Sequence, residues 1–255
     1  MRKKLSLVSI YVGIITFLLL LIPTKTHADI NIKNDSTNST HKVEFSINEY
    51  DGEGSSIWYE IKKGNVEHWK RSDSRGYLLA IRDENKLEMY YAFTNANYIY
   101  RDGDFYFDHP SYDNYKMPSL KTENHFTTGK KYELTIKNLT SNSFKASISR
   151  WADNRDADYF TLSSGDSENW NRELDTRGHL IAVKYSTLPS VYVYYLPSVE
   201  DIFSGIIDIQ STSSVDYAPK VWNTHTSREE ELTLVNVIPP SDKLESTYPT
   251  LTNFN

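Results

Sequence analysis

Residues 64–82 read GNVEHWKRSDSRGYLLAIR, and residues 165–184 read GDSENWNRELDTRGHLIAVK. Gly, Glu, Trp, Arg, Asp, Arg, Gly, Leu and Ala recur in the same order, with one residue inserted before the second Asp. Self-similarity at such a distance is the sequence signature of a duplicated unit. The block therefore predicts two copies of one domain.

The similarity continues on both sides of this block, with a spacing near 101 residues. Ser46 falls on Ser147, and residues 58–59 fall on residues 159–160. The segment that leads each copy occurs three times. Residues 30–34 resemble residues 134–138, and the leading strand recurs near the end of the chain with no domain after it.

Two divisions of the chain fit this pattern. In the first, residues 29–131 and 132–238 are the domains, residues 231–237 form an extra terminal strand, and residues 239–255 are a loose polar tail. In the second, the boundaries fall near residues 140 and 240. We favour the first division, because the expected mature N-terminus already supplies a leading strand.

The local patterns are those of strands. Apolar and polar residues alternate over residues 43–47, 132–136, 144–148 and 191–194, and turn residues separate the runs. Period-two alternation is typical of half-buried strands, and no twelve-residue segment keeps a helical stripe. The predicted fold is all-β, with two tandem homologous antiparallel β-sandwich domains after a signal peptide. Alternation also predicts that one face of each sheet meets solvent.

Residues 1–28 have the pattern of a secretory signal peptide. Basic residues precede an apolar run over residues 5–22, and Ala28 supplies a small residue at the expected cleavage site. The run is long enough to span a bilayer, so an uncleaved N-terminal anchor is the alternative. No second such run follows. We expect a secreted, extracellular chain with no transmembrane helix in its mature part.

The expected mature chain is acidic and lacks cysteine. Removing residues 1–28 takes away four of the 28 basic residues and none of the 34 acidic ones, which leaves a net charge of −10. This charge disfavours nucleic acid and anionic lipid headgroups as partners. An exported chain without cysteine, together with a lysine-led signal, favours a Gram-positive bacterium as the source.

The duplicated block carries the first candidate site. In an extended strand Glu67, Trp69 and Arg71 lie on one face, as do their counterparts in the second copy. An acid and an arginine beside an indole can pair across it and stack on it. Trp69, Arg71, Trp170 and Arg172 are therefore either a ligand platform or a structural anchor. We favour the anchor, because large aromatics at turn–strand junctions usually pack.

An excess of tyrosine, 19 residues in all, provides the second candidate site. Neighbours in a strand face opposite sides, so some of these rings should be exposed, where they can contact sugars, lipids or proteins. The alternative is that they cover both faces of thin sheets. Residues 98–115 are the richest stretch, and residues 206–208 of the second copy are less aromatic. The candidate ligand residues are Tyr98, Tyr100, Tyr106, Tyr112 and Tyr115.

The sequence offers little support for catalysis. The histidines lack metal-motif spacing, and neither a nucleophile elbow nor a phosphate-binding glycine loop occurs. Acidic clusters at residues 102–108 and 153–158 do not match a calcium loop, so we interpret them as solvated turns. We expect no catalytic residue, no cofactor and no metal.

One part of each copy resembles the aegerolysin family. Residues 136–147 read IKNLTSNSFKAS, and Arg71-Ser-Asp73 resembles the turn that precedes a core strand in that family. The resemblance implies a small acidic β-sandwich that binds particular membrane lipids and supports pore formation with a partner. The second copy has Arg172-Glu-Leu-Asp175 instead, and both copies lack the glycine-rich stretch after the turn. No lipid-site residue can therefore be carried over.

Export, duplication and surplus aromatics together predict a secreted, non-enzymatic protein that binds a cell-surface ligand, either a membrane lipid or a glycan. Duplication raises avidity without new contacts. Such a protein would serve as a toxin or virulence component or as an adhesive factor. The alternatives are a protein-binding module, such as an inhibitor or cell-envelope structural factor, and a secreted hydrolase.

Overall fold

The computed structural model describes residues 29–38, 42–50, 54–83, 86–109, 112–123, 128–151, 156–197, 205–210, 219–223 and 227–240. The predicted signal peptide and all but the first two residues of the predicted tail lie outside these ranges. Within them, no helix is long and apolar enough to cross a membrane.

The described residues form twenty strands and no helix, so the predicted all-β class is confirmed. The first ten strands are β1 (Asp29–Asn34), β2 (Val43–Ile47), β3 (Tyr59–Glu60), β4 (Val66–Lys70), β5 (Tyr77–Asp83), β6 (Lys86–Ala92), β7 (Ala96–Arg101), β8 (Asp104–His109), β9 (Tyr112–Lys116) and β10 (Lys121–Glu123). The second ten are β11 (Thr128–Asn138), β12 (Phe144–Ile148), β13 (Phe160–Leu162), β14 (Ser167–Asp175), β15 (His179–Tyr185), β16 (Val191–Leu196), β17 (Ile206–Ile209), β18 (Pro219–Asn223), β19 (Arg228–Glu231) and β20 (Thr233–Ile238).

The strands form four small sheets of five strands each. Outer sheet 1 has the order β4-β1-β7-β8-β9, and inner sheet 1 has the order β10-β6-β5-β2-β3. Outer sheet 2 (β14-β11-β17-β18-β19) and inner sheet 2 (β13-β12-β15-β16-β20) repeat these orders with every strand number raised by ten. The two repeats therefore share the same order of strands in both of their sheets. Each outer sheet also contains a parallel pair, β1 with β7 and β11 with β17, which departs from the predicted antiparallel sheets.

The segment that resembles a third leading strand has a different place. It is divided between β19, which ends at Glu231 in outer sheet 2, and β20, which begins at Thr233 and pairs with β16 in inner sheet 2. In the first repeat β10 occupies the position of β20. Because β10 is only three residues long and Leu-Thr-Leu alternation suits any half-buried strand, the sequence cannot reveal this equivalence.

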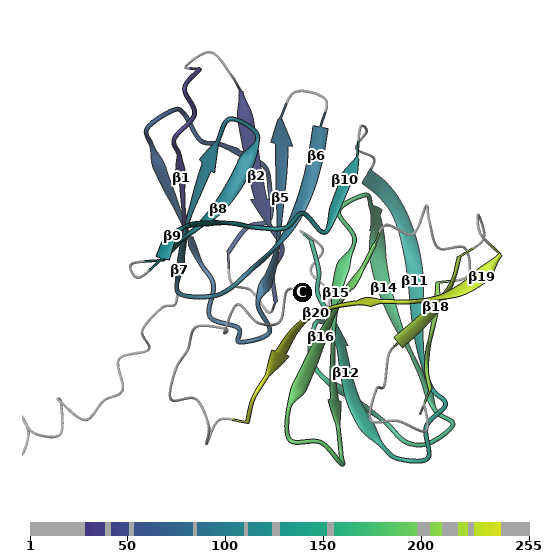
Figure 1. Cartoon of the computed structure of the whole chain (residues 1–255). Helices are drawn as coiled ribbons and strands as arrows, with labels where there is room; N and C mark the ends of the chain where they lie inside the picture. The colour runs from purple at the N-terminus through teal and green to yellow at the C-terminus, as the bar shows by residue number, and fades with distance from the viewer. Residues whose placement is uncertain are drawn as a thin grey trace, which may run out of the picture.

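Three hydrophobic clusters hold the sheets together. The first lies between outer and inner sheet 1 and includes Ile32 and Phe45. The second lies between outer and inner sheet 2. The third joins the two inner sheets and includes Leu78 of β5 and Leu180 of β15. Figure 1 shows the first repeat, purple to teal, against the second, which runs from teal in β11 through green to yellow in β20.

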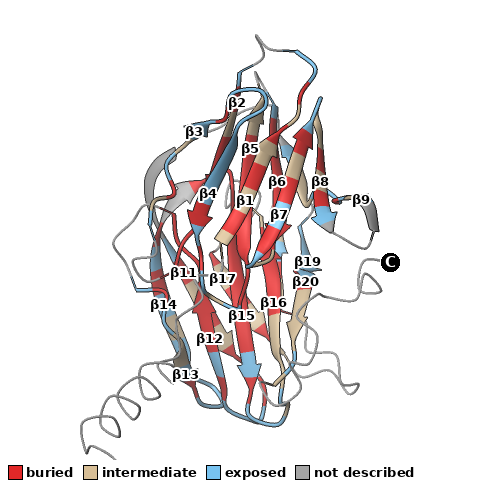
Figure 2. Ribbon diagram, turned by 90° about the vertical axis from the view of Figure 1, so that its left-hand side faces the viewer, coloured by how far each residue is buried: buried red, intermediate tan, exposed pale blue. Residues whose placement is uncertain are grey.

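The inner sheets are buried on both faces, so the expectation that one face of every sheet meets solvent is wrong for them. In β5 residues 77–81 are all buried, as are residues 179–183 in β15 (Figure 2). Residues 78–81 (LLAI) and 180–183 (LIAV) are continuous apolar runs, which are typical of strands covered on both sides. The four small sheets thus share one connected body instead of forming two independent sandwiches.

Candidate functional site

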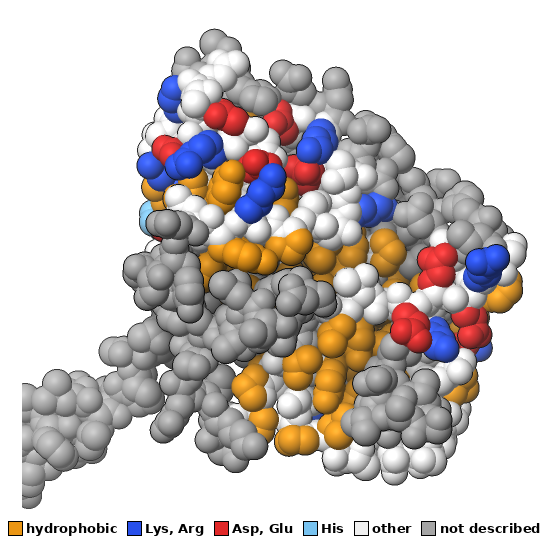
Figure 3. Space-filling model, in the orientation of Figure 1, with side chains coloured by type: hydrophobic (Ala, Val, Ile, Leu, Met, Phe, Trp, Pro, Cys, Tyr) orange, Lys and Arg blue, Asp and Glu red, His pale blue; other side chains and the backbone are white. Residues whose placement is uncertain are grey.

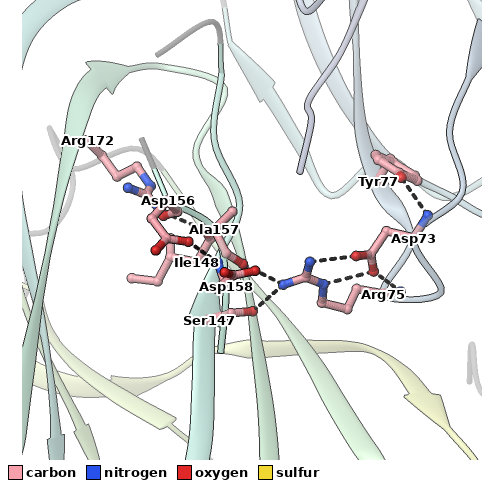
Figure 4. Close-up of polar contacts among 9 residues, drawn as sticks. All are labelled: Asp73, Arg75, Tyr77, Ser147, Ile148, Asp156, Ala157, Asp158 and Arg172. Atoms are coloured by element: carbon pink, nitrogen blue, oxygen red, sulfur yellow. Dashed lines mark hydrogen bonds and ion pairs between the residues drawn. The ribbon is translucent and has the colours of Figure 1, made fainter. Parts of the chain in front are cut away.

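The second arginine of the duplicated block, Arg75, crosses from the first repeat into the second (Figure 4). Its guanidinium donates hydrogen bonds to Ser147 Oγ at 2.7 Å and to the Ala157 carbonyl at 2.8 Å. Asp73 accepts from Arg75 Nε at 2.8 Å, and the ring centre of Tyr50 lies 3.8 Å from the guanidinium carbon. Although burial disfavours the charge, the hydrogen bonds with Asp73 hold the pKa of Arg75 above its ordinary value.

The second repeat makes the same contacts in return. Arg177 donates to Ser46 Oγ at 2.7 Å and to the Ser56 carbonyl at 3.3 Å. Asp175 accepts from Arg177 Nε at 2.8 Å, and the ring centre of Trp151 lies 3.8 Å from the guanidinium carbon. Both arginines are only 5% exposed, so a ligand in solution cannot reach them. The duplicated block joins the two repeats.

The glycine after each of these arginines has a left-handed backbone, with φ of 72° at Gly76 and 71° at Gly178. A Cβ at Gly76 would lie 2.1 Å from the hydroxyl of Tyr91, and one at Gly178 would lie 2.3 Å from the carbonyl oxygen of Leu196. A side chain does not fit in this turn, which accounts for Arg-Gly in both copies.

The structure buries the first predicted site. Trp69 and Trp170 are 6% and 3% exposed and belong to the first and second clusters. Arg71 donates to the carbonyls of four residues that precede it, and Arg172 does the same in its repeat. These carbonyls belong to Ile47, Asn48, Ser55 and Lys70 in the first repeat and to Ile148, Ser149, Asp156 and Asn171 in the second. The four side chains therefore brace the fold.

The predicted aromatic site is divided between core and surface. Tyr98 and Tyr100 are each 1% exposed, and burial raises the pKa of both hydroxyls. Tyr106 is half-buried and donates to Asp104 at 3.2 Å, and Tyr115 is half-buried against the first cluster. Tyr112 lies in β9, and its side chain is outside the described set. The five rings do not form one surface.

A groove of about 220 Å³ lies instead on outer sheet 2, with side chains from four of its strands. Its lining consists of Lys137, Ile206, Asp208, Lys220, Val221, Trp222 and Glu229. The indole of Trp222 is a large apolar surface that is 46% exposed. Figure 3 shows acidic and basic side chains gathered on the right, where Figure 1 places β18 and β19.

Strand register arranges Lys137, Asp208 and Lys220 of this groove in a row that Glu231, just outside the lining, continues. Lys137 is opposite Asp208, Asp208 is opposite Lys220, and Lys220 is opposite Glu231, so the signs alternate across four strands. The Lys220–Glu231 pair is loose, at 3.9 Å. Asp208 Oδ1 is buried and accepts no hydrogen bond within the described residues. Trp222 lies two residues along β18 from Lys220, on the same face of the sheet.

Sequence reasoning missed this groove, although a signal for it exists. In Lys220-Val221-Trp222 the central residue belongs to the second cluster, and strand alternation then places the lysine and the indole on the solvent side. Tyrosine-rich stretches drew attention to the first repeat, where Tyr59 is 37% exposed, whereas Trp222 of the second repeat is more exposed, at 46%.

Among the described residues, no group of three or more His, Cys, Asp or Glu side chains is placed to hold a metal ion. No protein-family model matches the chain, and no curated protein is detectably similar to it. The aegerolysin resemblance therefore stays a prediction.

Proposed function

We propose that this protein is a non-enzymatic binding protein that takes a sugar of a cell-surface glycan in the groove of outer sheet 2. The observation that carries the proposal is the half-exposed Trp222 next to a row of alternating charges. An indole presents a flat apolar surface with a polar edge, which suits the C–H face of a sugar ring. A concave site with a few polar groups then fixes the orientation of the ligand.

The polar groups of the groove suit hydroxyl groups. The carboxylate of Asp208 lines the groove and would accept a hydrogen bond from a sugar hydroxyl. Lys137 and Lys220 stand on either side of it and would donate to neighbouring hydroxyl oxygens. These groups would fix the orientation of a sugar that stacks on Trp222.

We also propose that the chain is organised as two units. Each outer–inner sheet pair would be one sandwich unit, with the units divided between β10 and β11. The clusters that fill each pair support this division. With the predicted export signal, the chain would act outside the cell as an adhesive factor or a toxin component.

The test is a glycan array probed with the full chain, with Trp222→Ala as the variant. We expect the variant to bind its best glycan at least about tenfold more weakly. Ile57→Ala is the matched control, because Ile57 is an exposed apolar residue of the first repeat (54%) and should not affect binding. Absence of any glycan binding, or equal binding by Trp222→Ala, would overturn the proposal. Binding only to neutral or anionic liposomes would overturn the sugar assignment.

A further inference from the structure

The joint between the repeats is symmetrical in its chemistry. Each contact made by Arg75 on the second repeat has a counterpart made by Arg177 on the first, with roles exchanged. The aromatic partners also correspond. Arg75 lies 5.0 Å from the ring centre of Tyr159, and Arg177 lies 5.4 Å from that of Trp58, at the equivalent position. Such reciprocity is the property of an isologous interface around a two-fold axis.

One pair of residues lies on this axis. Glu49 and Arg150 occupy equivalent positions in the repeats and form an isolated antiparallel bridge. The amide of Glu49 donates to the carbonyl of Arg150 at 3.0 Å, and the amide of Arg150 donates to the carbonyl of Glu49 at 3.2 Å. Their side chains are 9% and 10% exposed, with 3.8 Å between Arg150 Nε and Glu49 Oε1. At this bridge, where a residue faces its own equivalent, the repeats carry opposite charges.

We infer that each repeat presents a dimerisation face whose partner is another copy of the unit, and that Glu49 and Arg150 determine which copies pair. Pairing of two first units would place Glu49 against Glu49, and pairing of two second units would place Arg150 against Arg150. A buried charge that meets a like charge is strongly unfavourable. The contacts of Arg75 and Arg177 would recur in all three pairings. The hydrogen bond from Asn236 to the Tyr91 hydroxyl also joins the repeats, but it involves no charged group, so selection by charge rests on Glu49 and Arg150.

The selection has a consequence for the whole molecule. If first units could pair with first units, or second units with second units, the pairing would join different chains. A chain that carries two such faces would then assemble into larger oligomers. The opposite charges instead direct the first unit to the second unit, which the same chain holds at high effective concentration. The pair therefore favours a closed molecule that displays its two outer sheets on opposite sides of the joint.

The experiment starts from the folded full chain, with a protease site introduced into residues 124–127, which connect β10 to β11. After cleavage, differently labelled preparations are mixed, and the pairs are counted by native mass spectrometry. We expect the halves to remain associated and to form first–second pairs at least about tenfold more often than like pairs. In the neutralised variant Glu49→Gln/Arg150→Gln, we expect association to persist while like pairs rise towards the statistical proportion.

Asp104→Asn/Lys116→Gln provides the matched control, since it neutralises an ion pair on outer sheet 1, away from the joint. It should leave the preference for first–second pairs unchanged. Separation of the unmodified halves into monomers would show that the joint is not a dimerisation face. Persistence of strict first–second pairing in the neutralised variant would show that Glu49 and Arg150 do not select the partner.

Discussion

The two outer sheets share one topology and differ in what their solvent faces carry. On outer sheet 2 the row across four strands is Lys137, Asp208, Lys220 and Glu231. The equivalent row on outer sheet 1 is Lys33, Ile99, Tyr106 and Lys116. The register also places Asp108 of β8 at the position that Trp222 holds in β18.

Several charges on outer sheet 1 form ion pairs. Asp104 pairs with Lys116 at 2.6 Å, and Asp35 pairs with Arg101 at 2.8 Å and with Lys33 at 3.1 Å. Each outer sheet keeps one buried aspartate oxygen without a partner among the described residues, Asp29 Oδ1 in β1 and Asp208 Oδ1 in β17, so this feature does not distinguish the sheets. They differ in the half-exposed indole of Trp222, which stands beside the charged row of outer sheet 2. A duplicated scaffold can thus gain a ligand site by placing one aromatic ring next to an alternating row of charges.

The largest effect on stability should come from the arginines of the joint, which both repeats contain. Arg75→Met and Arg177→Met should each lower the free energy of unfolding, by up to about 3–5 kcal/mol, because each removes a buried guanidinium and leaves its aspartate without that partner. The loss should be larger for Arg177→Met, since the side chain of Asp175 is 4% exposed and that of Asp73 is 22% exposed. Urea unfolding of the full chain measures both values.

Arg101→Met, on the exposed face of outer sheet 1, is the control and should leave the urea midpoint unchanged. Suppose that one of the two substitutions leaves the free energy of unfolding unchanged. The two arginines would then contribute unequally to stability, although their contacts in the structure are equivalent.

A smaller effect concerns the pH dependence of stability, to which the second repeat contributes through a buried histidine. Tyr77 of the first repeat corresponds to His179 of the second, where burial, and next the charge of Arg172, lowers the pKa from 6.5 to about 4. The unfolded chain takes up a proton below pH 6.5 and the folded chain does not. Stability should therefore be complete above pH 6.5 and fall by about 3 kcal/mol as the pH drops to 4.

His179→Tyr, which introduces the residue of the first repeat, should flatten this part of the stability–pH curve, measured by urea unfolding at fixed pH values. His68→Gln alters an exposed histidine of β4 and should leave the curve as it is. An unchanged slope in His179→Tyr would assign the acid sensitivity to other groups.

A third effect concerns binding alone. Trp222→Ala should weaken sugar binding by about 1.4–2.7 kcal/mol, or roughly tenfold to a hundredfold, because the indole supplies most of the apolar contact. The free energy of unfolding should change little, since the ring is 46% exposed. Isothermal titration with the best array glycan and urea unfolding separate these two quantities. A large loss of stability would indicate that Trp222 belongs to the core.

The sequence predicted the all-β class and the duplication because both depend on local or repeated patterns. It could not predict that Arg75 and Arg177 cross the joint, since their partners Ser147 and Ser46 lie far along the chain and look like ordinary strand residues. The buried positions of Tyr98 and Tyr100 also depend on sheet pairing. By contrast, the exposure of Trp222 follows from alternation in β18 once Val221 is assigned to the core.

The smallest effect on sugar binding should follow when a tryptophan is introduced on outer sheet 1 without the other groups of the groove. Asp108→Trp places a tryptophan on outer sheet 1 at the position of Trp222, yet we expect no measurable sugar binding there in a background that carries Trp222→Ala. At the position of Asp208 this face has Ile99, which cannot accept a hydrogen bond, and Lys33 is already paired with Asp35.

Adding Ile99→Asp to this variant supplies a carboxylate between Lys33 and the introduced indole, and weak binding to the same glycan should then become detectable by titration. If Asp108→Trp alone were sufficient, an exposed aromatic on any strand of this fold would bind sugar, and the charged row would have no role in recognition. If both substitutions failed, the depth of the groove between β11 and β19 would be the deciding property, because outer sheet 1 would then carry the same chemistry on a surface of different shape.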